Sequence, residues 1–380
     1  MSVRLVTCWL KNSTLTLMQS RIAGARLHAT YTHLNSPPLF TSSSPRSSKT
    51  STPSNPITTS MASRDTSNQT AVTTAALTNP DGTLKRPPSA FRNTIEKGGT
   101  HEPEKGRYHL YVSYACPWAT RALITRRLKG LEDIIGVTVV SPRMDSDGWP
   151  FGSTDPFPGA EPDPFHDSKH VRDLYLRSNP EYSSRFTVPV LWDKKTEKVV
   201  NNESADIVRI LNTAFNDHIS PEKAKIDIYP EHLRAEIDAL HEWIYPNINN
   251  GVYRAGMAGN QQAYEAAVKD VFSALDKLEK TLEGKDYIVG NQLTEVDIRT
   301  WVTAVRFDVV YHGHFKCNIR NIRHGYPAIN AWMKKLYWTN PAFKESTDFD
   351  HIKTHYYYSH PHINPTRIVP SGPHPHIQTL

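Results

Sequence analysis

The sequence is poor in cysteine and in long apolar runs, and each shortage excludes a class of protein. Only three of its 380 residues are cysteine: Cys8, Cys116 and Cys317. Three thiols cannot build a disulfide framework or a zinc site made of thiolates, so we expect a reducing, intracellular environment. No segment approaches the ~18 consecutive apolar residues of a membrane-spanning helix, so no membrane partner is expected.

Acidic residues are missing from the first 64 positions. This stretch holds seven of the 44 Lys and Arg residues, none of the 38 Asp and Glu residues, and many Ser and Thr. Such a composition predicts that residues 1–64 are an organellar transit peptide, most simply a mitochondrial one. The alternative is a disordered tail without a targeting signal. Met61 begins the ordinary composition, and initiation there would give a cytosolic form.

The net charge of +6 comes from this same N-terminal stretch. Residues 65–380 hold 37 basic and 38 acidic residues, a net charge of −1. The part of the chain expected to fold is therefore not basic, and nucleic acid is not an expected partner.

Residues 65–100 are expected to be a linker, because the Pro-rich "KRPPSAF" and its surroundings are too poor in apolar periodicity to pack. Residues 101–220 then alternate short β-branched runs with helical patterns. The predicted order is β-α-β-α-β-β-α: strand 106–114, helix 116–130, strand 134–140, helix 169–178, strands 187–193 and 198–200, and helix 203–215. A helix between the first two strands predicts that they are parallel. This order is that of a thioredoxin-like domain.

The chain becomes helical over 221–350, with helices predicted at 232–245, 261–282, 296–307 and 329–336. Thr294 and Asp297 stand three apart before an apolar run, which predicts a capping box. Residues 351–380 are expected to be a C-terminal extension. A thioredoxin-like domain followed by such an all-helical domain resembles the glutathione transferase fold.

Cys116 lies where the first strand meets the first helix, and Pro117 follows it. Unpaired N–H groups and the helix dipole at a helix start favour a thiolate, and can lower a cysteine pKa from ~8.5 to roughly 3.5–7.5. We therefore expect an activated nucleophile, with a buried structural cysteine as the alternative. Ala119 stands where a dithiol enzyme keeps its second cysteine. An external thiol, for which glutathione is the obvious candidate, must then release Cys116 from a mixed disulfide.

Seven segments between Tyr108 and Pro373 occur together in one order. They are "YVSYACPWATRALITRRLKGLE", "DSDGWPF", "SRFTVPVLWD", "NNESADIVRILNTAFN", "NNGVYRAGMA", "VRFDVVYHGHFKCN" and "HYYYSHPHINPTRIVPSGP". This set resembles the glutathionyl-hydroquinone reductases, which are the xi-class, omega-like glutathione transferases. The resemblance implies a homodimeric enzyme with glutathione as co-substrate, which removes glutathione from glutathionylated aromatic molecules.

The resemblance also implies roles for individual residues. Cys116 matches the nucleophile, Tyr253 the general acid and base, and Tyr311 and Tyr356 match residues that support the cysteine. The glutathione pocket would be lined by Trp149, Arg185, Phe186, Thr187, Val188, Glu203 and Ser204. In thioredoxin folds the Val188–Pro189 bond is cis and faces the cysteine, whereas Glu203 and Ser204 begin a helix that can hold a carboxylate.

Two other functions remain open. An omega-like thioltransferase or dehydroascorbate reductase would use the same cysteine on other substrates. A catalytically silent module of the same fold would only bind partners, although it would have no need of the Cys-Pro-Trp-Ala, Val-Pro and Glu-Ser motifs together. The paired histidines His312/His314, His360/His362 and His374/His376 lack a third ligand at a recognised spacing, so no metal is expected.

Overall fold

The structure, a computed structural model, describes residues 78–380. The chain divides into the units Met1–Arg64 and Asp65–Leu380, and the described residues all belong to the second. The transit-peptide prediction, Cys8 and the alternative start at Met61 therefore lie outside the described residues.

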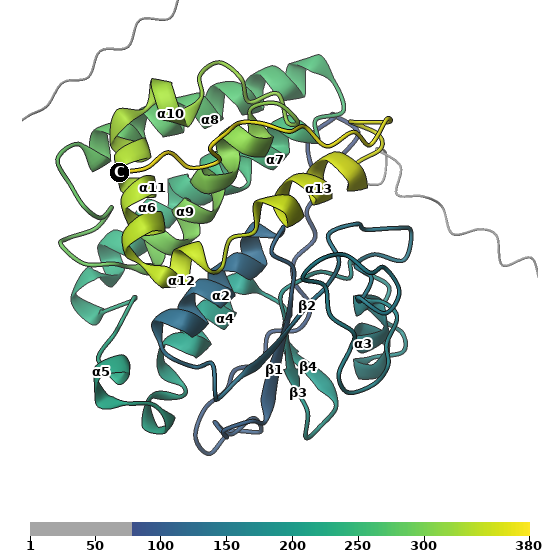
Figure 1. Cartoon of the computed structure of the whole chain (residues 1–380). Coiled ribbons are helices and arrows are strands. Elements are labelled where there is room, and N and C mark those ends of the chain that lie inside the picture. The colour runs from purple at the N-terminus through teal and green to yellow at the C-terminus, as the bar shows by residue number, and fades with distance from the viewer. Residues whose placement is uncertain (1–77) are drawn as a thin grey trace, which may run out of the picture. The chain divides into compact units, whose positions relative to one another are not determined.

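A four-stranded sheet forms the centre of the N-terminal domain, in the order β2-β1-β3-β4 (Figure 1). Its strands are β1 (Tyr108–Val112), β2 (Gly136–Val139), β3 (Val190–Asp193) and β4 (Lys198–Asn201). The predicted parallel pairing of β1 with β2 is confirmed, and β3 is antiparallel to both β1 and β4. Helices α2 (Pro117–Leu128) and α4 (Ser204–Thr213) pack together on one side, and α3 (Val171–Ser178) packs against β4. The whole of β1 is buried, as expected for a central strand covered on both faces.

Residues 221–359 are predominantly helical, so the fold is a thioredoxin-like domain followed by an all-helical domain, as the sequence predicted. The α-helices are α5 (Pro221–Ala224), α6 (Arg234–Ile244), α7 (Gly251–Gly256), α8 (Gln261–Leu282), α9 (Glu295–Arg306), α10 (Ile322–Gly325), α11 (Pro327–Thr339), α12 (Pro341–Lys344) and α13 (Phe349–Ser359). Short 3₁₀ turns occupy Asn216–His218 (η1) and Glu231–Leu233 (η2), and π-helical turns occupy Tyr245–Asn249 (η3) and Phe307–Tyr311 (η4). No helix of the described part is long and apolar enough to cross a membrane.

The predicted capping box at the start of α9 is confirmed. Asp297 accepts hydrogen bonds from the backbone N–H groups of Thr294 (3.0 Å) and Ile288 (2.9 Å), and from the indole N–H of Trp332 (3.1 Å). All of these groups are buried, and the carboxylate joins the start of α9 to α11 and to the loop before it.

The expected linker contains packed residues, which corrects part of that prediction. We call residues 78–95 the N-terminal strap. The N–H of Gly259 donates to the carbonyl of Gly82 (2.9 Å), and the N–H of Asn93 donates to the carbonyl of Val200 in β4 (3.1 Å). Ile95 is 3% exposed and belongs to the core under the sheet. The strap is held largely by backbone hydrogen bonds, which leave no apolar pattern in the sequence.

The expected C-terminal extension also contains a packed helix. Helix α13 buries His351, Ile352, Lys353, His355 and Tyr356 against the rest of the protein, and Figure 1 shows it between the helical bundle and the sheet. The exact domain boundaries at 100, 220 and 350 remain predictions.

Candidate active site

Cys116 is the N-cap of α2, with Pro117 in the first turn, as the sequence predicted. Its side chain is 8% exposed, and its Sγ lies 3.3 Å from the carbonyl oxygen of Val188. The Val188–Pro189 peptide bond is cis, which confirms that prediction. The backbone before β3 therefore faces the sulfur.

The sulfur of Cys116 is under opposing influences. Burial raises the pKa of the Cys116 thiol, whereas the N–H groups of Ala119 and Trp118 and the charges of Arg306 and Arg86 lower it. Burial is the larger influence, so the pKa of the Cys116 thiol is raised. The N–H groups expected to lower the pKa are in place, but burial outweighs them. A helix start can be read from sequence, whereas the burial of its first residue cannot.

The three tyrosines implied by the family resemblance lie together. The hydroxyl of Tyr356 is hydrogen-bonded to that of Tyr253 and lies 3.0 Å from that of Tyr311. Their rings contact one another, with centroids 5.5–6.3 Å apart. Burial raises the pKa of each phenol, and the charge of Cys116 acts on both Tyr253 and Tyr311. All three are therefore neutral hydrogen-bond donors close to the cysteine.

Two π-helical turns help to place these tyrosines. Turn η4 continues α9 and ends at Tyr311, whereas η3 joins α6 to α7, which carries Tyr253. Tyr356 comes from α13. A π-helical turn shifts the register of side chains by adding a residue to a helical turn, and such turns are frequent at functional sites. Sequence periodicity did not indicate either turn.

The residues proposed to bind glutathione differ in environment, and among them Val188 contacts the Cys116 sulfur. Glu203 caps α4 by accepting from the N–H of Ala205 (3.2 Å), and Ser204 is the first, buried residue of that helix. The hydroxyl of Tyr175 donates a hydrogen bond to the carbonyl oxygen of Thr187 (2.8 Å). The ring of Phe186 packs against that of Tyr175 (5.6 Å). Phe186 and Thr187 therefore help to hold the backbone that presents Val188.

Trp149 and Arg185 complete the proposed glutathione residues. Trp149 is 6% exposed, and its ring stacks on that of His355 with centroids 4.5 Å apart. Burial lowers the pKa of His355 to about 4, so this ring is neutral at pH 7. Arg185 is exposed and has no acidic partner among the described residues. The charges of Cys116 and Tyr253 act on its guanidinium.

Further arginines surround the start of α4. Arg121 is buried, lies 3.4 Å from the hydroxyl of Ser204, and has no partner for its Nε. Burial and the charge of Arg299 lower the pKa of Arg121 to about 9. Positive charge in excess of negative charge suits a peptide with two carboxylates, such as glutathione.

Arg121 and three further residues of the site were not singled out from the sequence. Arg306 donates to the carbonyl groups of Ala115 (3.1 Å) and Tyr114 (2.9 Å), so α9 fixes the turn that carries Cys116. His355 supports Trp149, as described above. Arg86 lies over the ring of Trp118, with its guanidinium carbon 4.2 Å from the centroid. These partners are far apart in the chain, and no local sequence signal joins them.

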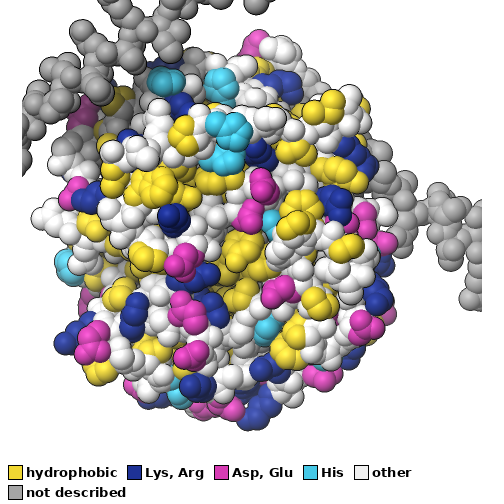
Figure 2. Space-filling model, viewed as in Figure 1, with side chains coloured by type: hydrophobic (Ala, Val, Ile, Leu, Met, Phe, Trp, Pro, Cys, Tyr) yellow, Lys and Arg dark blue, Asp and Glu magenta, His cyan; other side chains and the backbone are white. Residues whose placement is uncertain are grey.

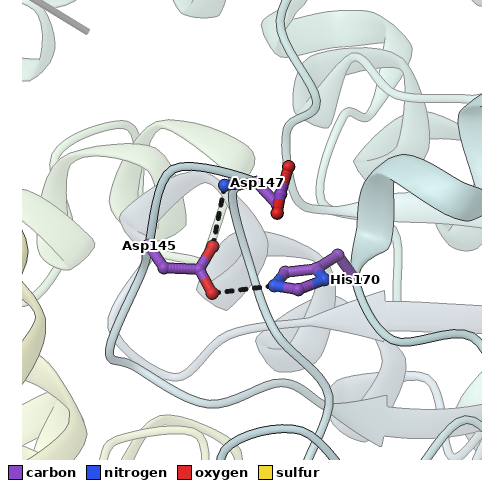
Figure 3. Close-up of side chains that lie close together, drawn as sticks. All are labelled: Asp145, Asp147 and His170. Carbon is purple, nitrogen blue, oxygen red and sulfur yellow. Dashed lines mark hydrogen bonds and ion pairs between the residues drawn. The ribbon is translucent and has the colours of Figure 1, made fainter. Parts of the chain in front are cut away.

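One group of side chains in the described residues has the spacing of a metal site: Asp145, Asp147 and His170 (Figure 3). Asp145 is hydrogen-bonded to His170 Nε2 (2.8 Å) and accepts from the N–H of Asp147 (2.8 Å), and Asp147 pairs with Arg172. The carboxylates thus have hydrogen-bond or ion-pair partners within the protein, and these contacts shape the loop that presents Trp149. Among the paired histidines, the ring nitrogens His314 Nε2 and His360 Nδ1 are hydrogen-bonded at 3.0 Å.

On the face shown in Figure 2, basic and acidic side chains are interspersed, and apolar side chains appear in the hollow near its centre. This face carries both signs of charge, as the near-zero net charge of residues 65–380 predicts.

Comparison with known proteins shows similarity over most of the described chain. Residues 115–214 match the glutathione S-transferase N-terminal domain, and residues 261–335 match the C-terminal domain. The chain is 52% identical to the glutathione S-transferase omega-like 2 of Schizosaccharomyces pombe, over 78% of this chain and 96% of that protein. It is 49% identical to the glutathionyl-hydroquinone reductase YqjG of Escherichia coli, over 77% of this chain and 89% of that protein. A xi-class glutathione transferase of Saccharomyces cerevisiae, solved in complex with glutathione, is 44% identical with a TM-score of 0.77, over 79% of this chain and 99% of that one.

Proposed function

Because the chain belongs to the xi class of the glutathione transferase family, we propose that it removes glutathione from glutathionyl-hydroquinones through a mixed disulfide on Cys116. The observation that carries the proposal is the position of Cys116: its sulfur faces the carbonyl of Val188, and its charge acts on two tyrosines of a hydrogen-bonded cluster of three. The similarity to a glutathionyl-hydroquinone reductase supports the substrate class. Glutathione is the co-substrate, in keeping with the glutathione complex of a relative.

The reaction has two steps. The Cys116 thiolate attacks the sulfur of the glutathionyl-hydroquinone, and the bond between that sulfur and the aromatic carbon breaks. The electron pair goes to the aromatic ring, which takes a proton supplied through Tyr253, and hydroquinone leaves. A second glutathione thiolate then attacks the glutathionyl sulfur of the Cys116 disulfide, giving oxidised glutathione and free Cys116.

The tyrosine cluster favours this reaction over the alternatives. A thioltransferase expels a thiolate, which needs little help from an acid, whereas an aromatic leaving group needs a proton. Three phenols with raised pKa values near the cysteine, two of them buried and Tyr253 half-buried, are suited to that task. A silent binding module has no need of either the cysteine or the phenols.

The direct test mixes the purified protein, glutathione and a glutathionyl-hydroquinone, and follows hydroquinone release by chromatography. We expect turnover by the wild-type protein and none by Cys116→Ser, because a serine hydroxyl has no base here to ionise it. Robust thioltransferase activity without hydroquinone release would replace this function with the omega-like one.

We also propose a mitochondrial location for the product that begins at Met1, a cytosolic form beginning at Met61, and a homodimer. The acid-free first 64 residues support the first two, and the family resemblance supports the third. A fluorescent fusion of residues 1–70 should enter mitochondria, whereas the chain from Met61 should stay in the cytosol. Diffuse signal from both fusions, or a monomer mass in light scattering, would disprove the corresponding proposal.

A further inference from the structure

We propose that the N-terminal strap forms part of the substrate site, and that Arg86 is its binding residue, whose guanidinium binds an anionic oxygen of the substrate. This inference deepens the proposed function and rests on it for the substrate class. The anionic oxygen is either a carboxylate of glutathione or an ionised hydroxyl oxygen on the hydroquinone ring.

The strap holds Arg86 next to the reacting cysteine. Trp118 follows Cys116 by two residues, and the Arg86 guanidinium carbon lies 4.2 Å from the centre of its ring. The Arg86 Nη1 also donates to the Asn250 side-chain oxygen (3.2 Å), just before the helix that carries Tyr253. These two contacts tie an exposed arginine to the helix that Cys116 begins and to the residue before the helix that carries Tyr253.

The charge of Arg86 is not balanced by an acid. Among the described residues it has no carboxylate partner. Its charge acts on Cys116, on Arg121 and on Arg185, and lowers the pKa of each. Like charges held close together are unfavourable, and a bound anion would relieve this repulsion. Arg92, in the same strap, differs because its guanidinium is paired with the carboxylate of Asp206.

The strap is anchored on both sides of the site. On the helical side Gly82 accepts from Gly259, as described above. On the sheet side the hydroxyl of Ser89 donates to Glu203 (3.0 Å), and the N–H of Phe91 donates to Asn202 (3.1 Å). In Figure 1 this purple segment runs from the helical bundle to the sheet. The strap thus reaches Glu203, a proposed glutathione residue, although it lies upstream of the matched family domains, which begin at residue 115.

The chemistry of arginine fits the proposed ligand. A guanidinium stays charged at every physiological pH and offers a planar fork of donors to a carboxylate or phenolate oxygen. Stacking on Trp118 orients the guanidinium and uses none of its N–H donors.

The experiment compares Arg86→Met and Arg86→Lys with Arg92→Met as the matched control in the full chain. Three quantities are measured: the affinity for S-methylglutathione, which has both carboxylates but no thiol, and kcat/KM on a glutathionyl-hydroquinone and on a simple glutathione mixed disulfide. The pH profile of Cys116 alkylation and the melting temperature are recorded for each variant.

We expect Arg86→Met to lose roughly 10- to 100-fold in kcat/KM on the glutathionyl-hydroquinone, as for a lost hydrogen bond to a charged group. Arg86→Lys should lose less, and Arg92→Met should stay within about twofold. A parallel loss of S-methylglutathione affinity identifies the carboxylate, whereas retained affinity and retained disulfide activity identify the ring oxygen.

Two results would overturn the inference. One is unchanged binding and turnover in Arg86→Met. The other is an equal loss on every substrate accompanied by an upward shift of the alkylation midpoint, which would show that Arg86 serves only the Cys116 thiolate. If the wild-type protein releases no hydroquinone, the proposed function fails, and S-methylglutathione affinity alone then decides whether Arg86 binds the substrate.

Discussion

At the scale of single residues, Cys116 shows how burial competes with a helix start. The N–H groups of α2 favour the thiolate, but burial is the larger influence and raises the pKa of the Cys116 thiol. A raised pKa means that less thiolate is present at neutral pH than in a free cysteine, so reactivity should increase as the pH rises through and above ~8.5. We expect the midpoint of Cys116 alkylation by iodoacetamide, followed by mass spectrometry, to lie above that of free cysteine.

The same measurement in denaturant provides the control, because unfolding removes both burial and the helix N–H groups. Its midpoint should return to the ordinary value. A midpoint in the folded protein below that of the denatured protein would show that the helix start outweighs burial after all.

Tyr253 gives a second prediction at this scale. Tyr253→Phe removes a proton donor directed at the aromatic leaving group, so hydroquinone release should fall roughly 10²–10⁴-fold. Cleavage of a simple mixed disulfide expels a thiolate and should largely survive. Steady-state rates on both substrates, compared with Cys116→Ser, which should abolish both activities, check this separation.

Equal losses on the two substrates in Tyr253→Phe would mean that this tyrosine serves the cysteine or the fold. Because the hydroxyl of Tyr356 contacts those of both Tyr253 and Tyr311, Tyr356→Phe should affect hydroquinone release as well.

At the scale of elements, the start of α9 depends on one carboxylate. Asp297→Ala removes the acceptor for four buried donors: the N–H groups of Ile288 and Thr294, the Thr294 hydroxyl and the Trp332 indole N–H. A buried donor left without a partner costs about 1–3 kcal/mol, so we expect the free energy of unfolding to fall by at least about 2 kcal/mol in urea titrations. Asp350→Ala, at an exposed position in the first turn of α13, is the control and should change it by less than about 0.5 kcal/mol. Equal effects would show that the capping box is dispensable.

The elements that the sequence predicted well are those with a strong local signal. The strands and helices around Cys116, and α8 with its apolar stripe from Ala267 to Leu282, follow from periodicity and turn residues. Helix α13 is rich in His and Tyr, and its pattern does not mark a buried face. The π-helical turn before Tyr311 is also invisible to periodicity, because it breaks the period of 3.6 residues. The family resemblance, rather than spacing, therefore identified the tyrosines.

At the scale of the whole molecule, the site is assembled from segments about 190 residues or more apart. Trp149 stacks on His355, and Arg306 holds the turn before Cys116. Such pairs depend on how the helical domain docks on the sheet, which a single sequence does not show. Arg86 is the residue of the site that its local sequence indicates least, because it lies in a Pro-rich segment that resembles a linker.

Shortened chains separate the two roles of the N-terminal strap, which are substrate binding through Arg86 and stabilisation of the fold through Phe91 and Ile95. The chain from Met61 keeps the whole strap, and we expect wild-type stability and hydroquinone release. The chain from Pro88 loses Arg86 but keeps the half-buried Phe91 and the buried Ile95, so its activity should fall roughly tenfold or more with a small change in stability.

The chain from His101 should lose stability as well. Burying one large apolar side chain contributes about 1.5–3 kcal/mol, and this chain lacks Ile95, Phe91 and the hydrogen bonds of Asn93 to the edge of the sheet. Urea titrations and hydroquinone release on the three chains check both effects. Because Arg86 and Ile95 act through different contacts, activity must drop between the first and second chains, and stability between the second and third. A chain from His101 as stable as the chain from Met61 would show that the strap is a linker after all.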